Sequence, residues 1–195
     1  MNPAGKTKYD PLTRWLHAAL AAAVVFQLLT DAVMRVPPGV GQGVRDWHRE
    51  MFEIHAHAGP AVAVICALHW LWICLPWSRP GLTYLFPWMQ RDRRATIYRE
   101  FKNLLQFETP SPRELSPLTG SVHGLGLLAV TGSVAGGLVS YLGYFAGLPI
   151  PAPVLHWAAL EQITMVWFVW AFVIGHVSMA LWHWSGGHAS QLDRT

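Results

Sequence analysis

The chain has 195 residues, of which 52% are hydrophobic and only 13% are charged. The charged share is about half of the ~25% that is usual in soluble domains, so the composition indicates a membrane protein. The net charge of +3 is too small to indicate nucleic-acid binding, and the length predicts a single domain over 1–195.

Four long tracts along the chain are nearly free of charged residues. They are Trp15–Leu29, Ile54–Trp77, Leu115–Ile150 and Val154–Trp184, the last containing only Glu161. Each tract holds the roughly 20 apolar residues that one membrane-spanning helix needs. We therefore predict an all-α, integral membrane four-helix bundle with spans over about 13–34, 54–76, 117–141 and 155–183.

The first span has a clear beginning. Asp10 is a favourable N-cap, Pro11 suits the first helical position, and His17 follows inside the helix. The segment TKYDPLTRWLHAAL contains no small-residue cleavage site. We therefore expect a retained span and not a signal peptide that is removed.

The second span carries three histidines and both cysteines of the chain. His55 and His69 lie roughly 21 Å apart along one side of a helix, a spacing that suits two cofactors stacked across a bilayer. His57 lies close to the first of them. No CxxCH motif occurs, which excludes covalently attached haem, and we interpret Cys66 and Cys74 as core residues.

The connection between the second and third spans is rich in Lys and Arg, as is the N-terminal segment. The positive-inside rule therefore places both termini and this connection on the cytoplasmic side. Within it, Ile97, Phe101, Leu104 and Leu105 recur at helical spacing among basic residues. We predict a helix over about 93–107 that lies either on anionic lipid or against the bundle.

The third and fourth spans supply small residues and further histidines. Gly120, Gly124, Gly132 and Gly136 form two pairs that allow close helix packing.

His17 and the fourth-span residue His176 are both expected near the inner ends of their helices. Neutral imidazoles at one depth on facing helices can hold haem iron, whereas zinc needs three or four clustered ligands.

Four segments in chain order, YDPLTRWLH, IHAHAG, LTGSVHGLG and VIGHVSMALWHW, carry a family resemblance. Together they resemble the bacterial cytochrome b561 and Ni,Fe-hydrogenase/formate-dehydrogenase cytochrome b family. The resemblance implies a multi-pass protein of the bacterial inner membrane that holds haem b. It also implies electron transfer between quinone and a periplasmic cytochrome or oxidoreductase subunit.

The resemblance implies particular haem ligands. His17 and His176 would hold the inner haem iron, and Arg14 would meet a propionate of that haem. His55, four residues before Gly59, would be a ligand of an outer haem.

The sequence departs from the family pattern at the fourth span. Gln162, a poor iron ligand, stands where the family has its second outer ligand. Either the outer haem is absent or His156 or His57 replaces that ligand, so the resemblance implies one or two haems. His69 and His123 are expected to be hydrogen-bonding histidines near propionates.

Three functions follow from these observations. The first is a membrane electron carrier that works with lipid-dissolved quinone and a periplasmic partner. The second is a stand-alone quinone-dependent enzyme such as a superoxide oxidase, which would need a basic outer surface to steer an anion. The outer loop Asp31–Glu53 is instead near neutral. The third is a haem-free, histidine-rich membrane protein.

Overall fold

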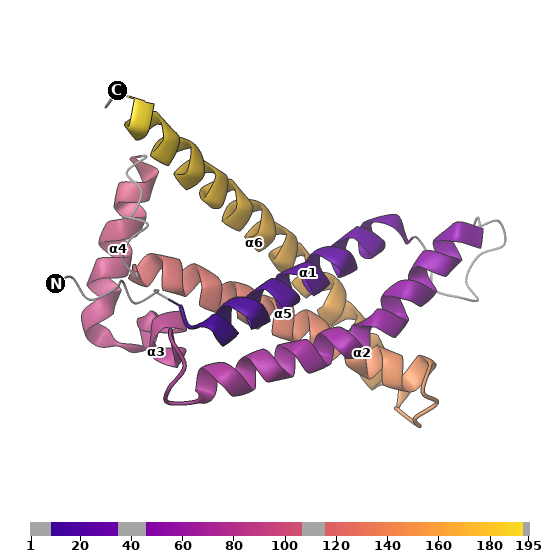
Figure 1. Cartoon of the computed structure of the whole chain (residues 1–195). Coiled ribbons are helices and arrows are strands. Elements are labelled where there is room, and N and C mark those ends of the chain that lie inside the picture. The colour runs from indigo at the N-terminus through magenta and orange to yellow at the C-terminus, as the bar shows by residue number, and fades with distance from the viewer. Residues whose placement is uncertain (1–8, 35–45, 107–115, 193–195) are drawn as a thin grey trace. The chain divides into compact units, whose positions relative to one another are not determined.

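The computed structural model describes residues 9–34, 46–106 and 116–192, with side chains up to Trp182. The elements in chain order are α1 (Pro11–Val33), α2 (Asp46–Cys74), α3 (Leu82–Leu85), the 3-10 helix η1 (Pro87–Met89), α4 (Arg91–Leu105), α5 (Pro117–Tyr144) and α6 (Ala152–Leu192) (Figure 1). The described part of the chain contains no strand, so the all-α prediction is confirmed.

Four of these helices are long and apolar enough to cross a membrane. They are α1, α2, α5 and the Ala152–Trp182 part of α6. Two helices extend beyond the predicted spans, because α2 begins at Asp46 and α6 continues to Leu192. Apolar composition marks only the part of a helix suited to lipid, whereas backbone hydrogen bonding also continues through polar residues.

Hydrogen bonds at Asp10 fix the beginning of α1. The Asp10 carboxylate accepts from the Thr13 backbone nitrogen at 2.7 Å and from the Thr13 hydroxyl at 2.6 Å. It also accepts from the Arg79 backbone nitrogen at 2.9 Å, and Trp72 Nε1 donates to Thr13 Oγ1 at 2.9 Å. The predicted N-cap therefore also ties α1 to the end of α2.

The chain divides into two compact units. The first comprises Met1–Leu82 and Leu128–Val166, and the second comprises Thr83–Leu127 and Trp167–Thr195. In the first unit α1 runs alongside α2 (Figure 1).

The two cysteines of α2 differ in their surroundings. Cys66 is buried, and its Sγ lies 3.7 Å from Thr131 Oγ1 of α5. Cys74 is exposed, so its interpretation as a core residue is wrong. Cys74 is the last residue of α2, and the preceding residue, Ile73, is the one that is buried there.

The glycines of α5 permit close approach within each unit. In the first unit, a Cβ at Gly136 would come within 2.5 Å of the Ala158 carbonyl oxygen. In the second unit, a Cβ at Gly120 or Gly124 would collide with a backbone carbonyl oxygen of Tyr84 or Leu85. The expected packing role of the small residues is therefore observed.

Glu100 attaches α4 to the beginning of α5 in the second unit. Its carboxylate accepts from the Ser116 hydroxyl and from the Leu118 backbone nitrogen, both at 2.8 Å. A carboxylate on a helix N-terminus satisfies backbone N–H groups that have no intrahelical partner. The predicted helix over 93–107 corresponds to α4, and residue 107 itself lies outside the described residues.

Candidate functional site

His55 lies on the side of α2 that meets α1. Its Nδ1 lies 2.9 Å from the Thr30 hydroxyl oxygen, and Gln27 Nε2 donates to its backbone carbonyl oxygen at 3.2 Å. Two successive turns of α1 therefore hold both the ring and the backbone of this histidine.

Space remains beside His55 at Gly59. A Cβ on Gly59 would meet Gln27 Nε2 at 3.7 Å, which is ordinary van der Waals contact. The Oε1 atom of Gln27 is buried and has no hydrogen-bond partner in the described part of the chain. Buried polar atoms are normally paired, so this acceptor is available to a bound group.

His57 faces a different neighbour from His55. Its Nδ1 donates to the Glu53 carbonyl oxygen at 2.8 Å, and its ring lies 5.1 Å from that of Phe145 and 5.9 Å from that of Tyr141. Residues two apart on a helix point to nearly opposite sides. The structure therefore places His57 in the contact between α2 and α5, while His55 faces α1.

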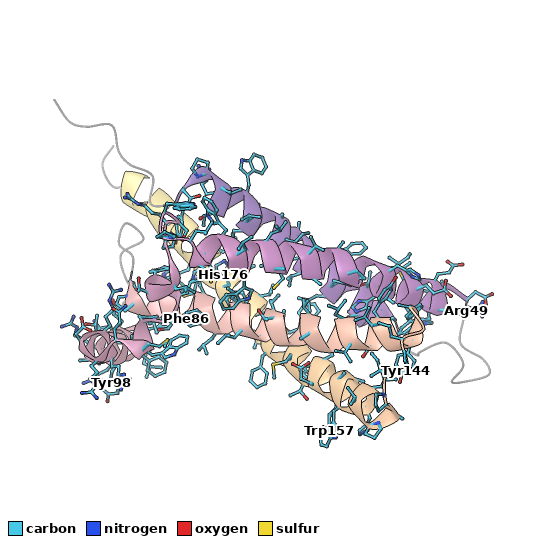
Figure 2. All side chains as sticks on the ribbon, turned by 90° about the horizontal axis from the view of Figure 1, so that it is seen from below. Arg49, Phe86, Tyr98, Tyr144, Trp157 and His176 are labelled. Atoms are coloured by element: carbon cyan, nitrogen blue, oxygen red, sulfur yellow. The ribbon has the colours of Figure 1, made fainter. Side chains whose placement is uncertain are left out.

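The beginning of α6 carries His156 and Gln162. His156 is exposed, and its ring lies 6.0 Å from that of Trp157, which is labelled in Figure 2. Gln162 is half-buried and lies against the glycines of α5, where a Cβ at Gly137 would come 2.9 Å from its Nε2. The amide of Gln162 therefore contributes to packing between α5 and α6.

The end of the first unit where α1 begins and α2 ends contains His17, Arg14 and His69. The first two are exposed on α1, and His69 is buried on α2 with 8% of its surface exposed. His69 Nδ1 has no hydrogen-bond partner among the described residues. A buried imidazole nitrogen of this kind suits an acidic group of a bound cofactor.

His176 lies in an aromatic cluster of the second unit, at the position labelled in Figure 2. The Phe172 ring stacks on it at 5.3 Å with an interplanar angle of 24°, and the His123 ring meets it edge-on at 4.8 Å and 87°. His123 Nδ1 donates to the Thr119 carbonyl oxygen at 2.7 Å. A Cβ at Gly175 would meet nothing within 4 Å, so the helix leaves room beside His176.

Sequence reasoning missed two residues next to the predicted ligands, Thr30 and Phe172. Phe172 precedes His176 by one helical turn, so the spacing of contacting residues on a helix face offered a signal for it. Thr30 meets His55 across two helices, and no local pattern indicates that contact. His17 and His176 belong to different units, so their pairing stays a prediction.

No group of three or more His, Cys, Asp or Glu residues that could hold a metal ion occurs within the described ranges 9–34, 46–106 and 116–182. The candidate ligands therefore stand as single imidazoles or pairs. This is the donor set that haem iron takes from a protein, because the macrocycle supplies the other four ligands.

A family model described as prokaryotic cytochrome b561 matches residues 8–194, which include all four spans and every candidate ligand. No curated protein and no solved structure matched the chain.

Proposed function

Because the chain belongs to the prokaryotic cytochrome b561 family, we propose that it carries electrons between the quinone pool and a periplasmic redox partner. The family match over nearly the whole chain is the observation that carries this proposal. It makes the protein a multi-pass, b-type haem electron-transfer protein of the bacterial inner membrane. Bound haem supplies one-electron redox chemistry, and the protein supplies ligands, orientation and electrostatics.

The proposed inner haem would be held by His17 and His176 as iron ligands. The open space at Gly175 supports it, because a macrocycle needs small residues beside its ligands. Phe172 and His123 fix the plane of the His176 ring through their contacts. His69 is proposed to donate a hydrogen bond to a propionate.

Arg14 is proposed to pair with a propionate of the same inner haem. It is exposed on α1, one turn before His17. A guanidinium at the end of a span can reach the membrane surface and meet a carboxylate there.

The proposed outer site uses His55 as one ligand. The absence of a side chain at Gly59, one turn after His55, and the hydrogen bond at His55 Nδ1 support it. His156 and His57 are both exposed, and either is proposed as the second outer ligand. The family position at Gln162 is engaged in helix packing.

The test is the haem content of detergent-purified protein, measured as pyridine haemochrome per polypeptide. We expect about two haems in the wild type and about one in each of the variants His176→Ala and His55→Ala, because each removes one axial ligand. The matched control is His48→Ala, since His48 Nδ1 donates to the Val33 carbonyl oxygen and is not a proposed ligand.

Other outcomes separate the parts of the proposal. One haem in the wild type that persists in His55→Ala would overturn the outer site and keep the inner one. No haem after haem supplementation would overturn electron transfer altogether. The quinone partner is tested separately, by reduction of the bound haem with a quinol in membranes.

A further inference from the structure

Thr30 is a buried hydroxyl residue in the apolar helix α1, with 6% of its surface exposed. Its Oγ1 lies 3.1 Å from the Phe26 carbonyl oxygen and 3.0 Å from the Gln27 carbonyl oxygen. The same atom lies 2.9 Å from His55 Nδ1 of α2. One hydroxyl therefore meets two acceptors on its own helix and one imidazole nitrogen on the next.

The Thr30 hydroxyl can donate either to the carbonyl oxygens of its own helix or to His55 Nδ1, and its contact with two carbonyl oxygens favours the first arrangement. A backbone carbonyl can only accept, and a threonine hydroxyl has one hydrogen to donate. When that hydrogen points to the carbonyl oxygens of its own helix, the lone pairs of Oγ1 face His55. His55 must then carry its hydrogen on Nδ1, which leaves a lone pair on Nε2.

This tautomer is the one that a metal-binding histidine needs. Such histidines usually donate the other ring N–H to a neighbouring acceptor, which fixes the ring orientation and raises the basicity of the ligand. The backbone of His55 is held as well, because Gln27 Nε2 donates to its carbonyl oxygen. Residues 27 and 30 of α1 thus fix both the position of His55 and its protonation pattern.

We infer that Thr30 is a positioning residue, whose hydroxyl accepts from His55 Nδ1 and presents Nε2 to the iron of the outer haem. This inference rests on the proposed function, since it takes His55 as an outer ligand. It assigns a task to a residue that does not itself touch the cofactor.

The test replaces the hydroxyl with a methyl group of similar size, Thr30→Val. We expect outer-haem affinity to fall about 10- to 100-fold. We also expect the reduction potential of the remaining outer haem to rise, because a less basic imidazole stabilises ferric iron less. Thr30→Ser keeps the hydroxyl and should retain the wild-type potential and haem content.

The matched control is Thr164→Val on α6. Thr164 also donates its hydroxyl to a carbonyl oxygen of its own helix, that of Leu160 at 2.7 Å, but it is exposed and has no role at His55. Thr164→Val should leave the spectrum, the potential and the haem content unchanged. The readouts are redox titration and haem content, neither of which depends on turnover.

Failure of this inference is distinguishable from failure of the proposed function. If His55→Ala removes a haem while Thr30→Val changes neither potential nor content, the Thr30 inference is overturned and the outer site stands. If His55→Ala removes no haem, the outer site itself is overturned.

If the Thr30→Val protein does not fold, a measurement on the wild type still tests the inference. Pulsed electron paramagnetic resonance of the ferric protein should detect an exchangeable proton on the remote nitrogen of His55 that disappears in D2O. Its absence would overturn the inference.

Discussion

The carboxylate of Asp10 accepts three hydrogen bonds at the beginning of α1. Its titration should therefore change the stability of the folded protein at acidic pH. Burial raises its pKa, but hydrogen bonds from the Thr13 hydroxyl and backbone, and from the Arg79 backbone, outweigh this effect and lower the pKa from 3.8 to about 2. The folded state therefore favours the charged form. This stabilisation is fully present above about pH 3.8 and is lost as the pH falls through about 2.

We expect Asp10→Asn to remove this pH-dependent contribution, because asparagine can still cap the helix but carries no charge. The difference in melting temperature between wild type and variant should therefore shrink as the pH falls from 4 to 2. Circular dichroism of the detergent-solubilised protein measures it. Asp92→Asn, which alters an exposed carboxylate in the first turn of α4, should show no such convergence. A melting-temperature difference between wild type and Asp10→Asn that stays constant from pH 4 to pH 2 would contradict the prediction.

Single residues differ in how far sequence reveals them. Asp10 and Pro11 specify the beginning of α1 through local chemistry, and the structure confirms the N-cap. Thr30 acts across two helices, and its partner His55 is distant in the chain. The edge-on contact of His123 with His176 likewise joins α5 and α6. Contacts between helices depend on rotation and register, which a single sequence does not encode in any local pattern.

Helix α4 has two different faces, one attached to α5 and the other largely exposed. Glu100 points toward the beginning of α5 and accepts two hydrogen bonds there. Tyr98, Phe101 and Leu105 lie away from Glu100 around the helix and have 72%, 49% and 67% of their surface exposed. Tyr98 is labelled on this helix in Figure 2. Lys102 lies next to Tyr98 around the helix, and a basic residue beside apolar ones is typical of helices that rest on anionic lipid.

We therefore predict that the exposed face of α4 lies in the membrane interface. A spin label at Tyr98→Cys, in a Cys66→Ala and Cys74→Ala background, should be more accessible to oxygen than to a water-soluble nickel complex. The bilayer should contain anionic lipid. A label at Arg99→Cys, about a quarter turn away on the helix, is the control and should favour the nickel complex. If both labels were more accessible to the nickel complex than to oxygen, α4 would lie in water and the prediction would be wrong.

Helices were easier to predict than their ends. The four spans follow from hydropathy because lipid demands long apolar segments. The polar beginning of α2 at Asp46 and the extension of α6 to Leu192 carry no such signal. The contact of Glu100 with Ser116 could not be predicted either. Amphipathic spacing indicates that α4 is a helix, but it does not identify the segment to which the helix is attached.

Across the full chain, the distribution of Lys and Arg predicts how the protein sits in the membrane. The connection that contains α4 carries a cluster of basic residues, whereas residues 145–151 between α5 and α6 carry none. Basic residues are retained on the cytoplasmic side during insertion. With four spans, we therefore predict that both termini lie in the cytoplasm and that His55 and His156 lie toward the periplasm. The loop residues 35–45, part of the near-neutral outer loop, lie outside the described residues.

Reporter fusions test this orientation directly. Alkaline phosphatase, which is active only in the periplasm, should be inactive when fused after Thr195 and active when it replaces residues 146–149. A green fluorescent protein fusion after Thr195 should fluoresce, because that reporter folds in the cytoplasm. The reverse pattern would place His55 and His156 on the cytoplasmic side. It would also contradict the proposed periplasmic partner, since the outer haem must lie nearest to the protein with which it exchanges electrons.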